Sequence, residues 1–171
     1  MNKLSLNVNK TTCIIFTPLT KSISSGKTSI NLQGTDIPFC NSTKFLGVII
    51  DKNLTWQSHI NFICNKIGKG VGIIIKLRSI LPSYILKMIY NSIILPYISY
   101  CNIAWGGTYV SRLHNLFVLQ NKAMRIITGT DISSHSRTAP LYYTNNCLNL
   151  FDIHKLQIGV FIHNWLNDRL P

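Results

Sequence analysis

The stretch from Lys44 to Ile60 changes its apolar pattern part of the way along. An alternating apolar run occupies residues 44–50, Asp51 breaks that run, and apolar residues then recur at steps of three and four. The first pattern is typical of a strand and the second of a helix. We therefore predict a strand that leads directly into a helix, within a chain of the α+β class.

Three or four short antiparallel strands are predicted within residues 1–52, because turn residues separate β-branched and apolar runs there. The expected strands are residues 11–16, 29–32, 37–39 and 44–50, with turns at Ser24–Lys27 and Gln33–Asp36. Of these, 29–32 should pair with 37–39 as a hairpin. Isolated hairpins are marginally stable in water, so this β section needs support from the helices or from sequence upstream.

Helical periodicity begins at residue 54. A first helix of about twenty residues should carry one apolar stripe, formed by Trp56, Ile60, Ile63, Ile67, Val71 and Ile74. A second helix around residues 85–93 must stop or kink at Pro96. The chain is thus expected to divide into a β section, 1–52, and a helical region, 53–171.

Two further helices complete a predicted bundle of about four. One covers residues 113–127 and should end at Gly129, which is suited to a C-cap. Residues 130–148 are rich in Ser, Thr and Asn and are expected to form a loop. The last helix should end near Asn167.

The charge of the chain indicates a polyanionic partner. Seventeen Lys and Arg face five Asp and no Glu, which gives a net charge of +12. Nucleic acid is the first partner to consider for such a charge. The alternative is that the charge only keeps an apolar chain in solution.

Several features favour an intracellular protein, in the nucleus or the cytoplasm, that is not secreted. Five cysteines lie far apart with no C-x-x-C, and the N-terminus lacks the apolar core of a secretory signal. Residues 88–111 carry no charge and are long enough to span a bilayer. Asn91, Pro96 and Gly106 interrupt that run, so a buried helix followed by a turn is the better interpretation, with no membrane partner.

Catalytic chemistry has little support in the sequence itself. Two-metal phosphoryl transfer needs clustered carboxylates, whereas the aspartates here lie at least fifteen residues apart with no Glu. We therefore expect them to cap helices or lie in turns, and we expect no bound cofactor. Cys and His show no metal-ligand spacing either, so no metal site is predicted.

Three glycines, Gly68, Gly70 and Gly72, lie inside the first predicted helix. They follow no strand, which excludes the usual phosphate loop. Each costs up to about 1 kcal/mol relative to alanine, so a close backbone approach is expected. Gly68 and Gly72 share one face, where we favour a neighbouring helix over a nucleic acid backbone.

The chain has a Phe-Leu-Gly segment at residues 45–47 and a Leu-x-Trp-x-x-His-Ile segment at 54–60. These two segments, with further motifs in order along most of the chain, resemble the reverse transcriptase of jockey-like non-LTR retrotransposons. In that family a Phe-Leu-Gly strand closes the palm, as at residues 45–47, and a Leu-x-Trp-x-x-His-Ile segment opens the thumb, as at 54–60. Residues 6–16 resemble motif D. The remaining similar segments are 65–78, 90–97, 100–106 and 119–129.

The resemblance implies roles for particular residues. Lys10 occupies the motif D lysine, a position proposed to protonate departing pyrophosphate, although a solvated turn lysine is the better interpretation in this chain. Phe45, Leu46 and Gly47 match the primer-grip strand. The thumb helices would hold an RNA/DNA template-primer duplex, with Lys66, Lys69, Arg78, Lys122 and Arg125 as phosphate contacts.

The family's catalytic aspartates all precede motif D, and this chain begins at motif D. We therefore expect the palm end and thumb of an RNA-directed DNA polymerase, inactive alone, with Mg²⁺ required only in the complete polymerase and the missing polymerase half as a possible partner. The alternative function is a small basic helical protein-protein interaction domain without affinity for nucleic acid. A third possibility is that the β section leaves an exposed edge and does not fold stably.

Overall fold

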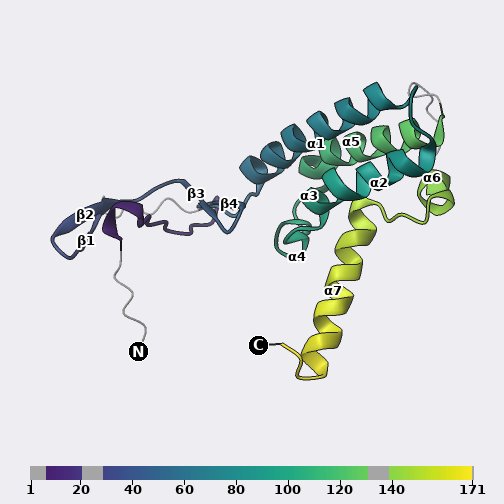
Figure 1. Ribbon diagram of the computed structural model, residues 1–171. Coiled ribbons are helices and arrows are strands. Elements are labelled where there is room, and N and C mark those ends of the chain that lie inside the picture. The colour runs from purple at the N-terminus through teal and green to yellow at the C-terminus, as the bar shows by residue number, and fades with distance from the viewer. Residues whose placement is uncertain (1–6, 21–28, 131–138, 171) are drawn as a thin grey trace. The chain divides into compact units, whose positions relative to one another are not determined.

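The computed structural model describes residues 7–20, 29–130 and 139–170. Within these ranges two antiparallel hairpins precede a series of helices, which confirms the α+β class (Figure 1). The chain divides into two compact units, Met1–His59 and Ile60–Pro171. The predicted boundary after residue 52 lies in the connection before the first long helix. The predicted turn at Ser24–Lys27 lies outside the described residues.

The first unit contains two separate two-stranded sheets. Strand β1 (Ser29–Leu32) pairs with β2 (Thr35–Pro38), so the predicted hairpin is confirmed. Strand β3 (Ser42–Phe45) pairs in the same antiparallel way with β4 (Val48–Asp51). Both hairpins have two-residue turns with positive φ at each central residue, which is the type I′ geometry that fits the twist of paired strands.

Two strand predictions in this unit are wrong. Residues 44–50 do not form one strand, because Leu46 and Gly47 make the turn between β3 and β4. An apolar run does not distinguish one strand from two joined by a tight turn, although Gly47 offers the positive φ such a turn requires. Residues 11–16 form no regular strand, only an isolated parallel bridge between Cys13 and Phe39.

The first long helix, α1 (Gln57–Leu77), confirms the predicted helix and most of its stripe. Five of the six stripe residues are at most 2% exposed, namely Ile60, Ile63, Ile67, Val71 and Ile74. Trp56 differs because it precedes α1 with a φ of 64° and is half-buried. The stripe therefore supplies one wall of the core of the second unit.

The helices after α1 are more numerous than predicted. Helix α2 (Ser83–Ile93) stops before Pro96, as predicted, and Pro96 lies in the first turn of α3 (Leu95–Ser99). A short α4 (Asn102–Trp105) follows, which the sequence did not indicate. The described residues thus divide the uncharged run 88–111 among several elements, and none of their helices has the length and apolar character needed to cross a membrane.

Of the three later helices, α5 and α7 were predicted and α6 was not. Helix α5 (Val110–Thr128) ends at Gly129, whose φ is 69°, as predicted. Helix α6 (Ala139–Thr144) interrupts the loop expected at 130–148, of which residues 131–138 lie outside the described ranges. Helix α7 (Leu150–Leu166) ends at the predicted Asn167. Four of the seven described helices are long, namely α1, α2, α5 and α7.

A buried glutamine joins three elements of the second unit. Gln120 of α5 is fully buried, and its Nε2 donates to the Tyr90 hydroxyl of α2 at 2.9 Å and to the Leu148 carbonyl at 3.1 Å. Its Oε1 accepts the backbone N–H of Leu150, at the start of α7, at 2.8 Å. Because a buried polar group is costly unless it is hydrogen-bonded, this network fixes α2 against α5, and the two helices pack together.

Candidate nucleic-acid interface

The exposed face of α1 is basic. Lys66, Lys69 and Lys76 are all exposed, and spacings of three and seven residues place them on one face of the helix, away from the buried stripe. Helix α1 contains no Asp or Glu that could neutralise them. Such a row of cations on one helix face is suited to successive phosphates of a nucleic acid backbone.

Lys66, in the middle of α1, and Arg78, just after its end, differ in their surroundings. The Lys66 Nζ lies 5.6 Å from the centroid of the Phe62 ring, a cation–π contact that restrains the ammonium group. Arg78 is exposed immediately after α1, where its backbone N–H donates to the Ile74 carbonyl. Lys76 was not among the predicted phosphate contacts, although its spacing of seven residues from Lys69 was a signal for it.

The glycines of α1 do not lie as predicted. A Cβ at Gly70, not at Gly68 or Gly72, would meet a neighbouring helix, since it would lie 3.0 Å from Ile94 Cγ1 and 3.5 Å from Ile93 Cδ1. A Cβ at Gly68 or Gly72 would have nothing within 4 Å. The helix neighbour favoured for that pair is therefore wrong. Gly72, three residues after Lys69 and four before Lys76, leaves the backbone uncovered beside the basic face.

The two predicted contacts on α5 are less accessible. Lys122 and Arg125 are both half-buried in the second half of that helix. Arg125 lies close enough to Tyr142 of α6 to influence it: burial raises the pKa of the Tyr142 hydroxyl, and the charge of Arg125 opposes that rise. The Tyr142 hydroxyl donates to Asn121 Oδ1 at 2.7 Å. This hydrogen bond joins α6 to α5.

The tip of the β3–β4 hairpin displays two large apolar side chains. Phe45 is 62% exposed and Leu46 is 73% exposed. Leu46 has a φ of 46°, which a bulky residue rarely adopts, and Gly47 follows with 87°. A strained turn that holds apolar side chains in solvent is a candidate contact site. Lys10 is exposed at the end of a short 3₁₀ turn, Val8–Lys10, in the same unit.

Two of the described aspartates lie where a helix begins, and Asp36 accepts the side-chain amide of Asn31 in the first hairpin. Asp51 accepts backbone N–H groups in the connection to α1, and Asp152 lies in the first turn of α7. Among the described residues there is no group of three or more His, Cys, Asp or Glu that could hold a metal ion. Within the ranges that the structure covers, the arrangement offers cations for a polyanion and no cluster of carboxylates.

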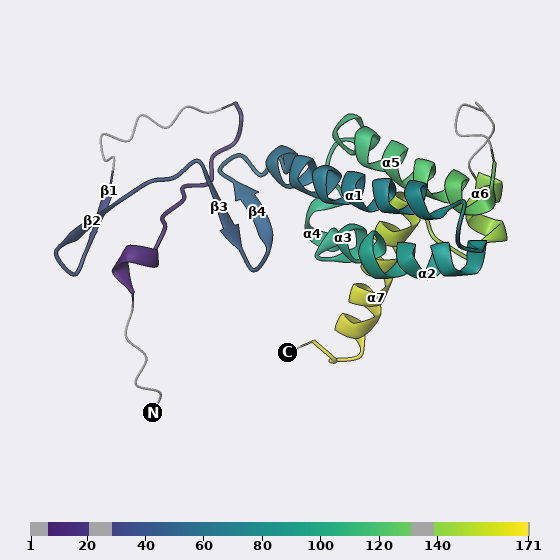
Figure 2. The same cartoon turned by 45° about the horizontal axis from the view of Figure 1, so that its top comes forward.

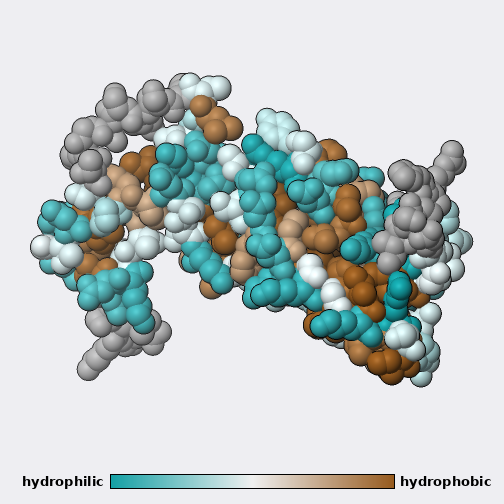
Figure 3. Space-filling model, turned by 90° about the horizontal axis from the view of Figure 1, so that it is seen from above, coloured by the Kyte–Doolittle hydropathy of each residue, from teal (hydrophilic) through white to brown (hydrophobic). Residues whose placement is uncertain are grey.

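The structure brings some of the predicted residues together. Lys66 and Lys69 share the basic face of α1, and Phe45, Leu46 and Gly47 form one hairpin tip. Lys122 and Arg125 lie together on α5. Hydrophobic residues also interrupt the hydrophilic surface of the helical unit (Figure 3), so its accessible surface is not uniformly polar. The assignment of these residues to nucleic acid stays a prediction.

Two curated proteins of Drosophila melanogaster are similar to the chain. A probable RNA-directed DNA polymerase from transposon X-element is 29% identical over 105 residues, which is 60% of this chain and 12% of that protein. A probable RNA-directed DNA polymerase from transposon BS is 28% identical over 128 residues, which is 73% of this chain and 14% of that protein. The match therefore spans about an eighth of the length of either relative. No family model and no solved structure matches the chain.

Proposed function

We propose that this chain is the palm end and thumb of a jockey-like non-LTR retrotransposon RNA-directed DNA polymerase, and that it holds the template-primer duplex. The observation that carries the proposal is the basic face of α1, because it lies in a chain with distant similarity to two transposon-encoded polymerases. In this assignment the first unit belongs to the palm and the helices from α1 onwards to the thumb. Its location would be the nucleus or the cytoplasm.

The α1 face is the phosphate-binding surface in this proposal. Lys66, Lys69 and Lys76 neutralise backbone phosphates, and Arg78 extends the row past the end of the helix. Phosphate contacts carry no sequence information, so binding is independent of sequence. Release of condensed counterions makes such binding fall steeply with salt.

The β3–β4 hairpin tip is the primer-contacting element in this proposal. Phe45 and Leu46 are held in solvent by the type I′ turn, and Gly47 adds no side chain that would hinder a close approach. Apolar and aromatic side chains contact the faces of sugars and unpaired bases well. The tip would therefore contact the end of the primer while α1 binds the duplex.

Polymerisation itself requires carboxylates that this sequence does not contain as a pair. Paired carboxylates are needed to hold two Mg²⁺ ions, and the chain has no Asp-Asp pair and no Glu. In this proposal these residues are inactive by themselves, and Mg²⁺ and the general-acid role of Lys10 matter only beside the catalytic half of the polymerase. That half is consequently a proposed partner.

A charge-matched pair of variants tests the proposal. Fluorescence anisotropy measures binding of the full chain to a labelled RNA/DNA duplex over a salt series. The double substitution Lys66→Gln with Lys69→Gln removes two cations from the α1 face. The control, Lys155→Gln with Arg169→Gln, removes two exposed cations from α7 and the segment after it.

The expected result is a steep salt dependence in the unmodified chain. The α1 variant should lower the slope of log affinity against log salt by about 2, since each phosphate contact contributes roughly 0.9 to the slope. The control should leave the slope unchanged. Equal losses in both variants would mean that net charge alone drives binding, and affinity that does not change with salt would contradict the proposal.

A further inference from the structure

The second half of α7 has a surface that the proposed duplex-binding role does not use. The only buried residues of α7 are Leu150 and Ile153, in its first turn. Beyond them the helix extends away from the other helices of its unit (Figures 1 and 2). Its exposed apolar side chains are Leu156, Ile158, Val160, Phe161, Ile162, Trp165 and Leu166, each 37–68% exposed.

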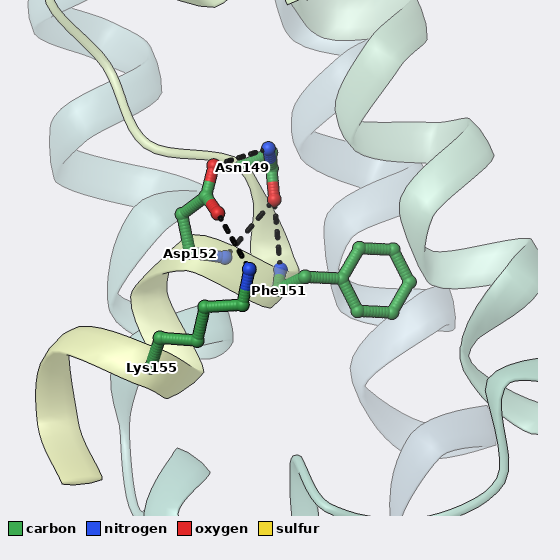
Figure 4. Close-up of polar contacts among 4 residues, drawn as sticks. All are labelled: Asn149, Phe151, Asp152 and Lys155. Carbon is green, nitrogen blue, oxygen red and sulfur yellow. Dashed lines mark hydrogen bonds and ion pairs between the residues drawn. The ribbon is translucent and has the colours of Figure 1, made fainter.

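The first half of α7 is firmly anchored. The Asn149 side chain caps the helix by accepting the N–H groups of Phe151 at 2.9 Å and Asp152 at 3.0 Å (Figure 4). Gln157 donates to the Ser99 carbonyl at 2.6 Å and accepts the Ile103 N–H at 3.0 Å. The direction of the helix is thereby fixed from Asn149 to Gln157, so the apolar half beyond is presented in one orientation.

The exposed half has the pattern of a helix-pairing surface. One stripe along the helix, with the spacing i, i+3, i+4, i+7, i+8, contains Ile158, Phe161, Ile162, Trp165 and Leu166. Gly159 lies on the flank of this stripe, and a Cβ there would have nothing within 4 Å. A helix that is apolar on most sides is normally covered, and a half-helix of this length is marginal in water without a partner.

The absence of charged residues from this stripe favours one kind of partner over two others. Residues 156–166 contain no Lys, Arg, Asp or Glu, in a chain of net charge +12. Nucleic acid is disfavoured there because it needs cations, and a lipid surface usually recruits helices whose polar face is rich in Lys and Arg. Because the stripe is uncharged, two copies of this strongly basic chain can meet along it with their own cations kept outside the contact.

The area is adequate for a weak symmetric pair. On a scale of roughly 150–250 Å² for one large side chain, five half-exposed side chains offer about 500 Å² per copy. Two copies together bury about 1,000 Å², near the lower limit for a specific interface. We propose that the stripe of Ile158, Phe161, Ile162, Trp165 and Leu166 pairs with the same stripe of a second copy of this chain, forming a reversible dimer.

Sedimentation equilibrium of the nuclease-treated full chain tests this proposal in high salt. High salt screens bridging through nucleic acid but leaves apolar contacts intact, so the result is independent of duplex binding. The mass should rise from 19.4 kDa towards twice that value as concentration increases. A variant with Ile162→Lys and Trp165→Lys should stay monomeric, because it places four like charges in the symmetric contact.

The control is Tyr84→Lys with Met88→Lys, which adds the same charge to α2 at side chains that are 66% and 60% exposed. It should dimerise like the unmodified chain, and circular dichroism should show both variants folded. A chain that is monomeric at every concentration would overturn the proposal, as would a dimer that persists in the α7 variant. Large polydisperse species, or binding to neutral phosphatidylcholine vesicles by a monomeric chain, would also overturn it.

Discussion

The carboxylate of Asp51 accepts the backbone N–H of Trp56 at 2.8 Å. It also accepts the N–H groups of Thr55 at 2.9 Å and Asn53 at 3.2 Å. Within this connection Leu54 and Trp56 have φ values of 51° and 64°, which large residues rarely adopt. One carboxylate thus holds a strained connection between β4 and α1.

Replacement of Asp51 should destabilise this connection. Asp51→Ala leaves three backbone donors without their acceptor and should cost about 1–2 kcal/mol, the usual range for a lost cap. Asp51→Asn keeps an acceptor oxygen and should cost less. Hydrogen exchange of the amides of residues 53–57 reports the change locally. Unchanged protection in Asp51→Ala would show that the connection is held by other contacts.

Stability should also depend on the protonation of Asp51. Burial raises the pKa of this carboxyl, but the hydrogen bonds from Thr55, Trp56 and Asn53 outweigh it and leave the pKa below the ordinary value of 3.8. The stabilisation is therefore complete above that value and is lost as the pH falls through the lowered folded-state pKa. Urea midpoints over an acid pH series should show this loss in the unmodified chain and less of it in Asp51→Asn.

His59 adds a second pH dependence with the same sign. Its Nδ1 accepts the Ile49 N–H at 3.3 Å, and burial holds its pKa below the ordinary value of 6.5. The unfolded chain then binds a proton more readily, so stability falls as the pH drops from about 6.5 towards the folded-state pKa. Urea midpoints measured through this window should fall in the unmodified chain. In His59→Gln the same series should be flat; a matching fall there would assign the effect to another group.

The strand-to-helix change at Asp51 was predictable, whereas the turn at Leu46 was not. Period-two and period-3.6 patterns depend on local spacing, and both lie within a few residues of Asp51. A type I′ turn usually carries Asn-Gly or Asp-Gly, and this chain places Leu before Gly47. The sequence therefore predicted one continuous strand, because Leu46 stands where Asn or Asp would indicate a turn.

Leu46→Asn should stabilise the β3–β4 hairpin and, if the hairpin tip contacts the primer as proposed, weaken binding to a primer end. Asn tolerates positive φ better than Leu, so relief of strain should add about 1 kcal/mol, and little burial is lost because Leu46 is 73% exposed. Gln33→Asn is the matched control, since Gln33 occupies the same turn position of the β1–β2 hairpin with a φ of 51°. Hydrogen exchange should show added protection in the β3–β4 hairpin of Leu46→Asn and in the β1–β2 hairpin of Gln33→Asn. Binding to a recessed primer end should weaken only in Leu46→Asn. Equal binding by both variants would exclude the tip as a primer contact.

Contacts between residues far apart in the sequence could not be predicted from it. Gly106 has an ordinary helical backbone conformation, so nothing local marks it. A side chain is excluded at Gly106 by Asn102 and His154, which are distant from each other in the sequence. They meet where α7 packs against α4, with His154 Nδ1 3.0 Å from Asn102 Oδ1. The same limit applied to Lys122 and Arg125, which are half-buried although the sequence placed them as phosphate contacts.

Gly106→Ala should disturb the docking of α7. A Cβ there would collide with Asn102 Oδ1 and would lie 2.6 Å from His154 Nδ1 and 2.7 Å from the Asn102 carbonyl. Since that space cannot open without moving α4 or α7, we expect a loss of about 1–3 kcal/mol in thermal unfolding. Gly107→Ala is the control, because its Cβ would meet His154 Nε2 at 3.4 Å, an ordinary contact. Equal melting temperatures for the two variants would contradict the packing described.

Gly68→Ala combined with Gly72→Ala should separate stability from binding on α1. A Cβ at either position enters open space, and alanine is favoured over glycine in a helix by up to about 1 kcal/mol, so the melting temperature should rise. If the duplex backbone lies against the uncovered glycines beside Lys69, the added methyl groups should lower affinity several-fold despite this gain. Gly70→Ala is the control, since its Cβ would instead press on Ile94 at 3.0 Å, within the protein. A stabilised double variant with full affinity would place the duplex on the lysine side chains alone, away from the helix backbone.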